Sequence, residues 1–242
     1  MLRSTGQLYG YRIQAADAEV GEVADFFFDD AFWMVRYLVV ETVEWLGNRR
    51  VLIAPRAVGK PNWLAGILPV ELTKEQIEQS PPTDWSEPVS QQHEVELHSH
   101  YGWDYYRLSL ESPVQPEEMD MEEAEPLPAD RDGPHLRSSK AVTDYSIHAT
   151  DDAVGHVANM LLDDETWVLR YLVVDTHEWL PSKQVLVATE WVDAVDWTHA
   201  TVHLDVTEAM VKGSPKYDPT APVTRGYEKN LYDYYARPKY WM

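Results

Sequence analysis

The stretch WMVRYLVV at residues 33–40 recurs as WVLRYLVV at residues 167–174. The same spacing relates Gly21 to Gly155 and Asp29-Asp30 to Asp163-Asp164, and no gap interrupts the alignment. Self-similarity at one fixed distance indicates two copies of a single structural unit. We therefore interpret the 242-residue chain as a tandem duplication.

The residues around this stretch predict a β-hairpin in each copy. In the first copy, β-branched and aromatic residues fill 23–28 and 33–41, and Asp29-Asp30-Ala31-Phe32 separates the two runs. This composition is typical of two strands and their turn. Further short strands are expected at 50–54 and 64–72, so five or six strands should precede the helices.

Each copy should end in helices. Thr73 and its counterpart Thr207 are expected to N-cap a short helix that stops before the next Ser-Pro pair. A second, tail helix should begin at Ser90 or Thr224, which are again capping residues. Aromatic and apolar residues four apart then share one face of the tail helix, which should pack on the strands.

The expected fold class is all-β with short helices, as two small β-barrels in tandem that each carry a helical tail. The first barrel and its tail should occupy residues 1–107, and the second 140–242. Residues 108–139 are rich in Pro and acids and lack a periodic apolar pattern, so they are expected to form a linker.

The strand pattern resembles that of the PRC-barrel family, named for the cytoplasmic domain of the photosynthetic reaction centre H subunit. The family also includes the C-terminal domain of the ribosome maturation factor RimM. The resemblance rests on residues 21–25, the Asp29-Asp30 turn, and residues 38–41 and 51–55, and the second copy matches. The tails are similar to those of bacterial tandem PRC-barrel proteins. The resemblance implies the barrel but no particular activity, because neither the membrane helix of the H subunit nor the RNA-maturation domain of RimM has a counterpart here.

Charge and composition narrow the classes of partner. The chain has 41 acids against 20 bases and a formal net charge of −21, which repels phosphate backbones and anionic lipids. We therefore expect no nucleic-acid partner and no direct membrane insertion. The absence of Cys excludes disulfides and thiolate chemistry, and is typical of a reducing compartment, so a cytoplasmic protein without cofactors is expected.

Two groups of residues could bear acid/base or metal chemistry. The adjacent acids Asp29-Asp30 could form an acid/base pair or a cation site, but neighbouring turn residues point apart, and Asp favours turns for its own backbone bonds. A surface turn is the favoured interpretation. His98-Ser99-His100 has metal-like spacing, yet the second copy has Tyr at the equivalent positions. We therefore expect no metal to support the fold.

Two further positions carry polar residues in both copies. Asp25 is replaced by Asn159 in the second copy, which keeps the hydrogen-bonding shape but not the proton chemistry, so a structural role is expected. Arg36 and Arg170 are kept with nearby acids at 41 and 175. This suggests a salt bridge at a barrel rim or interface, and the alternative is a clamp for a substrate anion.

The favoured function is a non-enzymatic adaptor or scaffold that presents duplicated aromatic surfaces to a partner protein, since aromatics are enriched at interfaces. The alternative is a small-ligand-binding protein or enzyme with a site between the barrels. The candidate interaction or interdomain surface comprises Trp33, Arg36, Tyr37, Trp45, Trp63, Trp167, Arg170, Tyr171, Trp179, Trp197, Tyr232, Tyr234 and Tyr235.

The repeated strand also predicts how the copies are arranged. Residues 33–40 are apolar at nearly every position, whereas a lone barrel buries only one face of a strand. Two copies of one apolar patch are complementary under two-fold symmetry, so the barrels should pack on each other within the chain. The rival arrangement pairs the patches between chains, as a homodimer.

Overall fold

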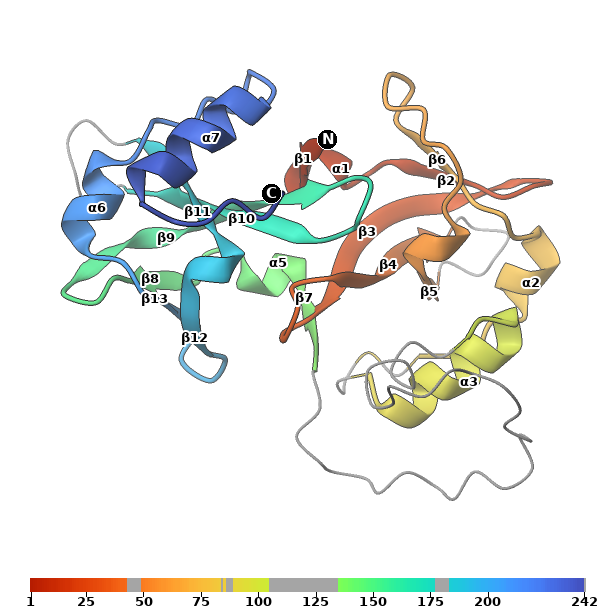
Figure 1. Ribbon diagram of the computed structural model, residues 1–242. Coiled ribbons are helices and arrows are strands. Elements are labelled where there is room, and N and C mark those ends of the chain that lie inside the picture. The colour runs from red at the N-terminus through yellow and green to blue at the C-terminus, as the bar shows by residue number, and fades with distance from the viewer. Residues whose placement is uncertain (43–48, 84, 86–88, 105–134, 177–182, 242) are drawn as a thin grey trace, which may run out of the picture.

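The computed structural model describes residues 1–42, 49–83, 85, 89–104, 135–176 and 183–241. It is mainly β, with short helices and two sheets, which confirms this part of the predicted fold class. Figure 1 shows the sheets side by side, one built from each half of the sequence. Within the described residues, no helix has the length and apolarity needed to cross a bilayer.

Within the described residues, the first copy contains ten elements. They are β1 (Leu2–Ser4), α1 (Thr5–Leu8), β2 (Arg12–Gln14), β3 (Glu19–Asp29), β4 (Val35–Thr42), β5 (Arg50–Ile53), the 3-10 turn η2 (Pro55–Ala57), β6 (Ile67–Pro69), α2 (Lys74–Glu78) and α3 (Gln91–Tyr101). Thr73 and Ser90 cap α2 and α3 as predicted, since each side chain accepts a bond from the third residue of its helix. The short helix α1 has no counterpart in the sequence-based prediction.

The second copy repeats this order with one additional strand, β12. Its elements are β7 (Leu136–Ser138), α5 (Ser139–Val142), β8 (Ser146–His148), β9 (Ala153–Asp163), β10 (Leu169–Asp175), β11 (Gln184–Ala188), η3 (Thr189–Trp191), β12 (Val192–Asp196), β13 (Thr201–Leu204), α6 (Glu208–Gly213) and α7 (Arg225–Tyr234). Thr207 and Thr224 cap the last two helices. Strand β7 lies inside the range 108–139 predicted as linker, because a three-residue strand is too short to show periodicity.

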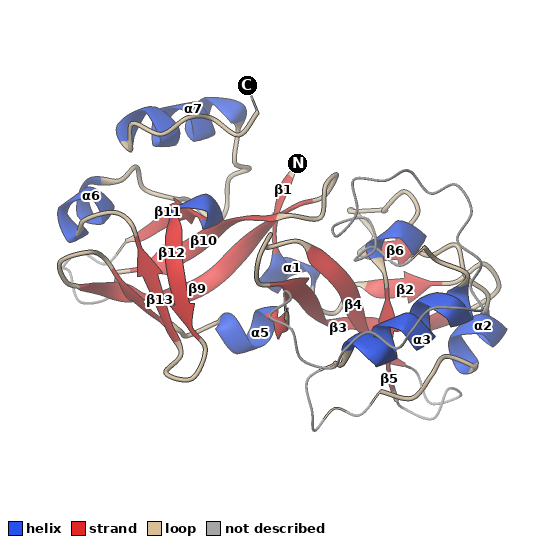
Figure 2. Cartoon of the chain, turned by 60° about the horizontal axis from the view of Figure 1, so that its bottom comes forward, coloured by secondary structure: helices blue, strands red, loops and turns tan. Residues whose placement is uncertain are grey.

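The first strand of each copy pairs with the sheet of the other copy. The first sheet has the order β5-β4-β3-β2-β6 and also takes β7 beside β3, whereas the second has β11-β10-β9-β8-β13-β12 and takes β1 beside β9. Arg3 lies opposite Leu162, and Arg137 opposite Phe28. Helices α1 and α5 follow these strands and lie between the two sheets in both views (Figures 1 and 2). The copies thus exchange N-terminal arms.

A second contact places a two-fold axis between the copies. Met34 forms an antiparallel bridge with Val168, its own equivalent in the repeat. The amide of Val35 donates to the Trp167 carbonyl, and the amide of Leu169 donates to the Trp33 carbonyl, both at 2.8 Å. A residue that pairs antiparallel with its own equivalent lies on a local two-fold axis. Packing of the copies within one chain is therefore confirmed.

The apolar strand packs against its own tail helix, as predicted. All of β4 from Val35 to Val40 except Arg36 is buried. The tail helix covers one face, since the Tyr37 hydroxyl meets His98 of α3 at 2.9 Å. In the second copy Tyr171 meets Glu228 of α7 at 2.8 Å. The copies meet through their turns and arms rather than through this strand face.

Candidate functional site

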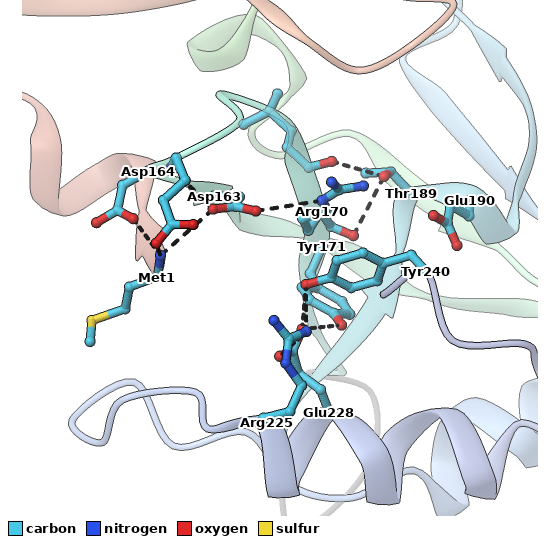
Figure 3. Close-up of polar contacts among 12 residues, drawn as sticks. Met1, Asp163, Asp164, Arg170, Tyr171, Thr189, Glu190, Arg225, Glu228 and Tyr240 are labelled. Atoms are coloured by element: carbon cyan, nitrogen blue, oxygen red, sulfur yellow. Dashed lines mark hydrogen bonds and ion pairs between the residues drawn. The ribbon is translucent and has the colours of Figure 1, made fainter. Parts of the chain in front are cut away.

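The candidate site is the junction between the copies, where the hairpin turns, the exchanged arms and the end of the second tail meet. Figure 3 shows two groups of polar contacts there, one that joins Met1 and Asp163 to Arg170 and one that joins Glu228 to Tyr171 and Tyr240.

The two adjacent acids of each turn have separate roles. Asp29 is fully buried, accepts from the Phe32 amide at 2.6 Å and pairs with Arg36 at 2.7 Å. Asp30 instead accepts from Arg137 Nε of the exchanged arm at 3.0 Å and from the His135 amide at 2.8 Å. The prediction of a surface turn is therefore wrong for Asp29, because its carboxylate is directed inward onto Arg36.

In the second turn the two adjacent acids also have separate roles, with one difference from the first turn. Asp164 pairs with Arg3 at 2.7 Å and with the amino group of Met1. Asp163 lies 3.9 Å from Arg170 Nε, which is a looser contact than the pair of the first copy. The predicted salt bridge of each arginine is thus made with the turn and not with residue 41 or 175. Those acids lie five residues further along the strand, about 16 Å away at 3.3 Å per residue.

The residue pair Asp25 and Asn159 anchors the arms. Asp25 accepts from the hydroxyls of Ser138 and Ser139, the latter at 2.7 Å. Asn159 accepts from the Thr5 hydroxyl at 2.8 Å and the Gly6 amide at 3.2 Å. Either side chain can accept such bonds, which explains why the first copy can have Asp at this position and the second copy Asn. This confirms the structural role predicted for Asp25.

Two of the predicted tryptophans hold the arm arginines. The guanidinium of Arg3 lies 3.7 Å from the ring centroid of Trp63, and that of Arg137 lies 4.2 Å from Trp197. Each guanidinium therefore contacts an aromatic ring of its own copy and a carboxylate of the other copy. Such cation–π contacts reinforce the ion pairs.

The other candidate surface residues lie in several environments. Trp33 is buried in the first turn, and both Trp33 and Trp167 have the left-handed backbone that turns their carbonyls toward the other copy. Tyr37, Tyr171, Tyr232 and Tyr235 are buried, whereas Tyr234 is 41% exposed. Trp45 and Trp179 lie outside the described residues.

A buried carboxylate joins the second tail to its sheet. Glu228 accepts from the hydroxyls of Tyr171 and Tyr240, both at 2.8 Å, and pairs with Arg225 at 3.0 Å. Burial and the nearby carboxylate raise the pKa of Tyr240 to about 12. The guanidinium of Arg170 lies over the Tyr240 ring at 4.3 Å, so the tail and the turn are linked through this ring.

The first copy keeps a buried carboxylate at this place, Glu94, but has His98 where the second copy has Tyr232. His98 Nδ1 donates to the Asp104 carbonyl at 2.9 Å, so Nε2 is free to accept the hydrogen of the Tyr37 hydroxyl. Burial lowers the pKa of this imidazole. Within the described part of the chain, no three His, Asp or Glu side chains gather as a metal site.

A pocket of about 460 Å³ opens beside this network. Its walls come from the first turn, with Asp30, Phe32 and Trp33, and from η3 and β12 of the second copy, with Glu190 and Asp193. Volumes of this size are typical of ligand sites. The sequence analysis did not identify Glu190 or Asp193, because only the folded junction brings them near the first turn.

Comparison with known proteins gives no relative. No protein-family model matches this chain, and no curated protein matches it significantly.

Proposed function

We propose that the chain is a non-enzymatic adaptor whose two copies form a single rigid body that presents acidic surfaces to a partner protein. One observation supports the proposal. The polar residues at equivalent positions of the two copies bind other parts of the same chain. Asp25 and Asp30 bind the exchanged arm, and Asp29 binds Arg36. Groups with such fixed partners are poorly placed to act on a substrate.

We further propose that each copy is a PRC-type barrel, as the strand pattern suggests. In support, a short strand precedes the long hairpin of each copy. This strand pairs in parallel with a later strand: β2 with β6, and β8 with β13. Pairing between an early and a late strand brings the two ends of a sheet toward each other, as in small barrels.

The adaptor proposal is tested by proximity labelling of the tagged protein in its own cells. A stable partner should be labelled by the wild type, and purified partner and chain should form a complex without turnover of a small molecule. A purified complex is the decisive readout, because labelling alone includes bystanders. If no binary complex forms with any labelled protein, the adaptor proposal fails.

A second candidate function is the binding of a small ligand in the junction. The observation that favours it is the 460 Å³ pocket, whose walls carry ionisable groups from both copies. Thermal stabilisation by a metabolite, lost on substitution of Glu190, would favour this candidate over the adaptor.

A further inference from the structure

The junction pocket carries excess negative charge. Asp30 is neutralised by Arg137, and Arg170 of the pocket wall faces Asp163. Glu190 and Asp193 are exposed, and within the described residues neither forms an ion pair with a basic side chain. Tyr232 holds one Glu190 oxygen at 3.5 Å. The pocket wall thus carries the acids Asp30, Glu190 and Asp193 against one base, Arg170, and this surplus of negative charge favours a cation.

The pocket wall is also aromatic. Trp33 and Trp197 line it, and Phe32, which is 52% exposed, lies at its rim. Aromatic faces attract cations and pack well on the flat guanidinium group.

The molecule itself shows how this combination binds a guanidinium. Arg3 lies over Trp63 and pairs with Asp164, and Arg137 lies over Trp197 and pairs with Asp30. An acidic turn beside a Trp thus holds an arginine in both copies. The pocket places a further pair of acids, Glu190 and Asp193, next to the second of these sites. Arg170 lines the same pocket, but within the described residues no ion pair joins it to either acid.

The equivalent position in the other half of the junction has a different charge. Arg56 stands where the second copy has Glu190, and Gly59 stands where it has Asp193. The acidic pocket is therefore a property of one half of the junction. A requirement of the fold would apply to both halves, whereas a binding site need occur only once.

We propose that the pocket formed by Phe32, Trp33, Glu190 and Asp193 binds an Arg or Lys side chain from a basic segment of the partner protein. This inference rests on the adaptor function proposed above and specifies where and by what chemistry the partner is held. The carboxylates pair with the cationic head, and the aromatic rings contact its flat or aliphatic part.

The test uses a fluorescein-labelled peptide, Gly-Ser-Arg-Arg-Ser-Gly, and the full chain in about 150 mM salt, where weak surface attraction is screened. Fluorescence anisotropy reports binding. The Glu190→Gln/Asp193→Asn variant should bind the peptide about tenfold or more weakly. The matched control, Glu71→Gln/Glu78→Gln, removes the same charge from exposed acids of the first copy and should bind within about twofold of wild type. The citrulline version of the peptide should not bind.

Four results would overturn the proposal. The first is a lack of binding by the wild type, and the second is an equal loss in both double variants, which would indicate attraction to overall charge. The third is spermidine binding as tightly as the peptide, which would indicate a site for small cations. A purified partner complex that survives the Glu190→Gln/Asp193→Asn change would refute the pocket while leaving the adaptor function intact.

Discussion

Arg137 Nε lies 3.0 Å from Asp30, across 107 residues of sequence, and its guanidinium stacks on Trp197. The symmetric contact joins Arg3 to Asp164 and Trp63. These arginines therefore hold each exchanged arm to the turn of the other copy.

The Arg137–Asp30 pair should contribute measurably to stability, because both groups are mostly buried. In a double-mutant cycle with Arg137→Ala and Asp30→Asn, denaturant unfolding should give a coupling energy of about 1 to 2 kcal/mol. The exposed pair Arg12 and Glu19, 3.5 Å apart, is the control and should couple by less than about 0.5 kcal/mol. Equal coupling in the two cycles would argue against arm anchoring by this pair.

The two hairpin turns should respond differently to loss of their first acid. Asp29→Ala leaves Arg36 without its carboxylate in a buried site and should cost about 3 to 5 kcal/mol. Asp163→Ala should cost only about 1 kcal/mol, because Asp163 is 16% exposed and its contact to Arg170 is 3.9 Å. Urea melts of the two variants make the comparison. Similar losses would show that the two distances do not reflect different energies.

The hairpin was predictable from sequence, but the burial of Asp29 was not. The repeat, the strands and the capping residues Thr73 and Ser90 all follow from local pattern, because caps and strand composition act over a few residues. Whether a turn carboxylate faces solvent or a strand arginine depends on the register of the hairpin, which has a bulge between Phe27 and Phe28. No local pattern specifies that bulge.

The arm exchange was hidden for another reason. Leu-Arg-Ser occurs at both 2–4 and 136–138, so either arm carries the same residues for either sheet. Because the two arms have the same residues, the arm sequence does not determine whether an arm joins the sheet of its own copy or that of the other copy. The geometry of the loop that follows the arm determines this choice. The alignment of Asp25 with Asn159 marked a structural role, but it gave no indication that Ser139 or Thr5 was the partner.

Stability should fall in mild acid through His98. Burial lowers the pKa of His98 below its ordinary 6.5, so the unfolded chain binds a proton there that the folded chain resists. This contribution to stability is full above about pH 6.5 and is lost as the pH falls through and below that value. His98→Tyr, the residue type of the second copy, should flatten the fall in denaturation midpoint between about pH 7.5 and 5.5. An unchanged slope would assign the acid sensitivity to other groups.

The two repeated glycines should not tolerate a side chain. A Cβ at Gly21 would lie 2.0 Å from the Glu41 carbonyl oxygen, and one at Gly155 would lie 2.0 Å from that of Asp175. Either Gly→Ala change should cost about 3 kcal/mol or more, since backbone would have to move. The nearest atom to a Cβ at Gly59 is 3.6 Å away, so Gly59→Ala should change thermal stability little. A mild effect at Gly21 would contradict the close strand approach.

The central claim is that the two copies close on each other within one chain about a two-fold axis. Met34 and Val168 form a bridge in which the flanking residues make the hydrogen bonds. In such pairs the Cα atoms lie about 4.5 Å apart, which suits a disulfide. The chain has no Cys, so Met34→Cys/Val168→Cys would introduce a single pair. The direct measurement is intact mass and light scattering of the oxidised variant. We predict a monomer with one internal disulfide, and a covalent dimer or two free thiols would contradict the account.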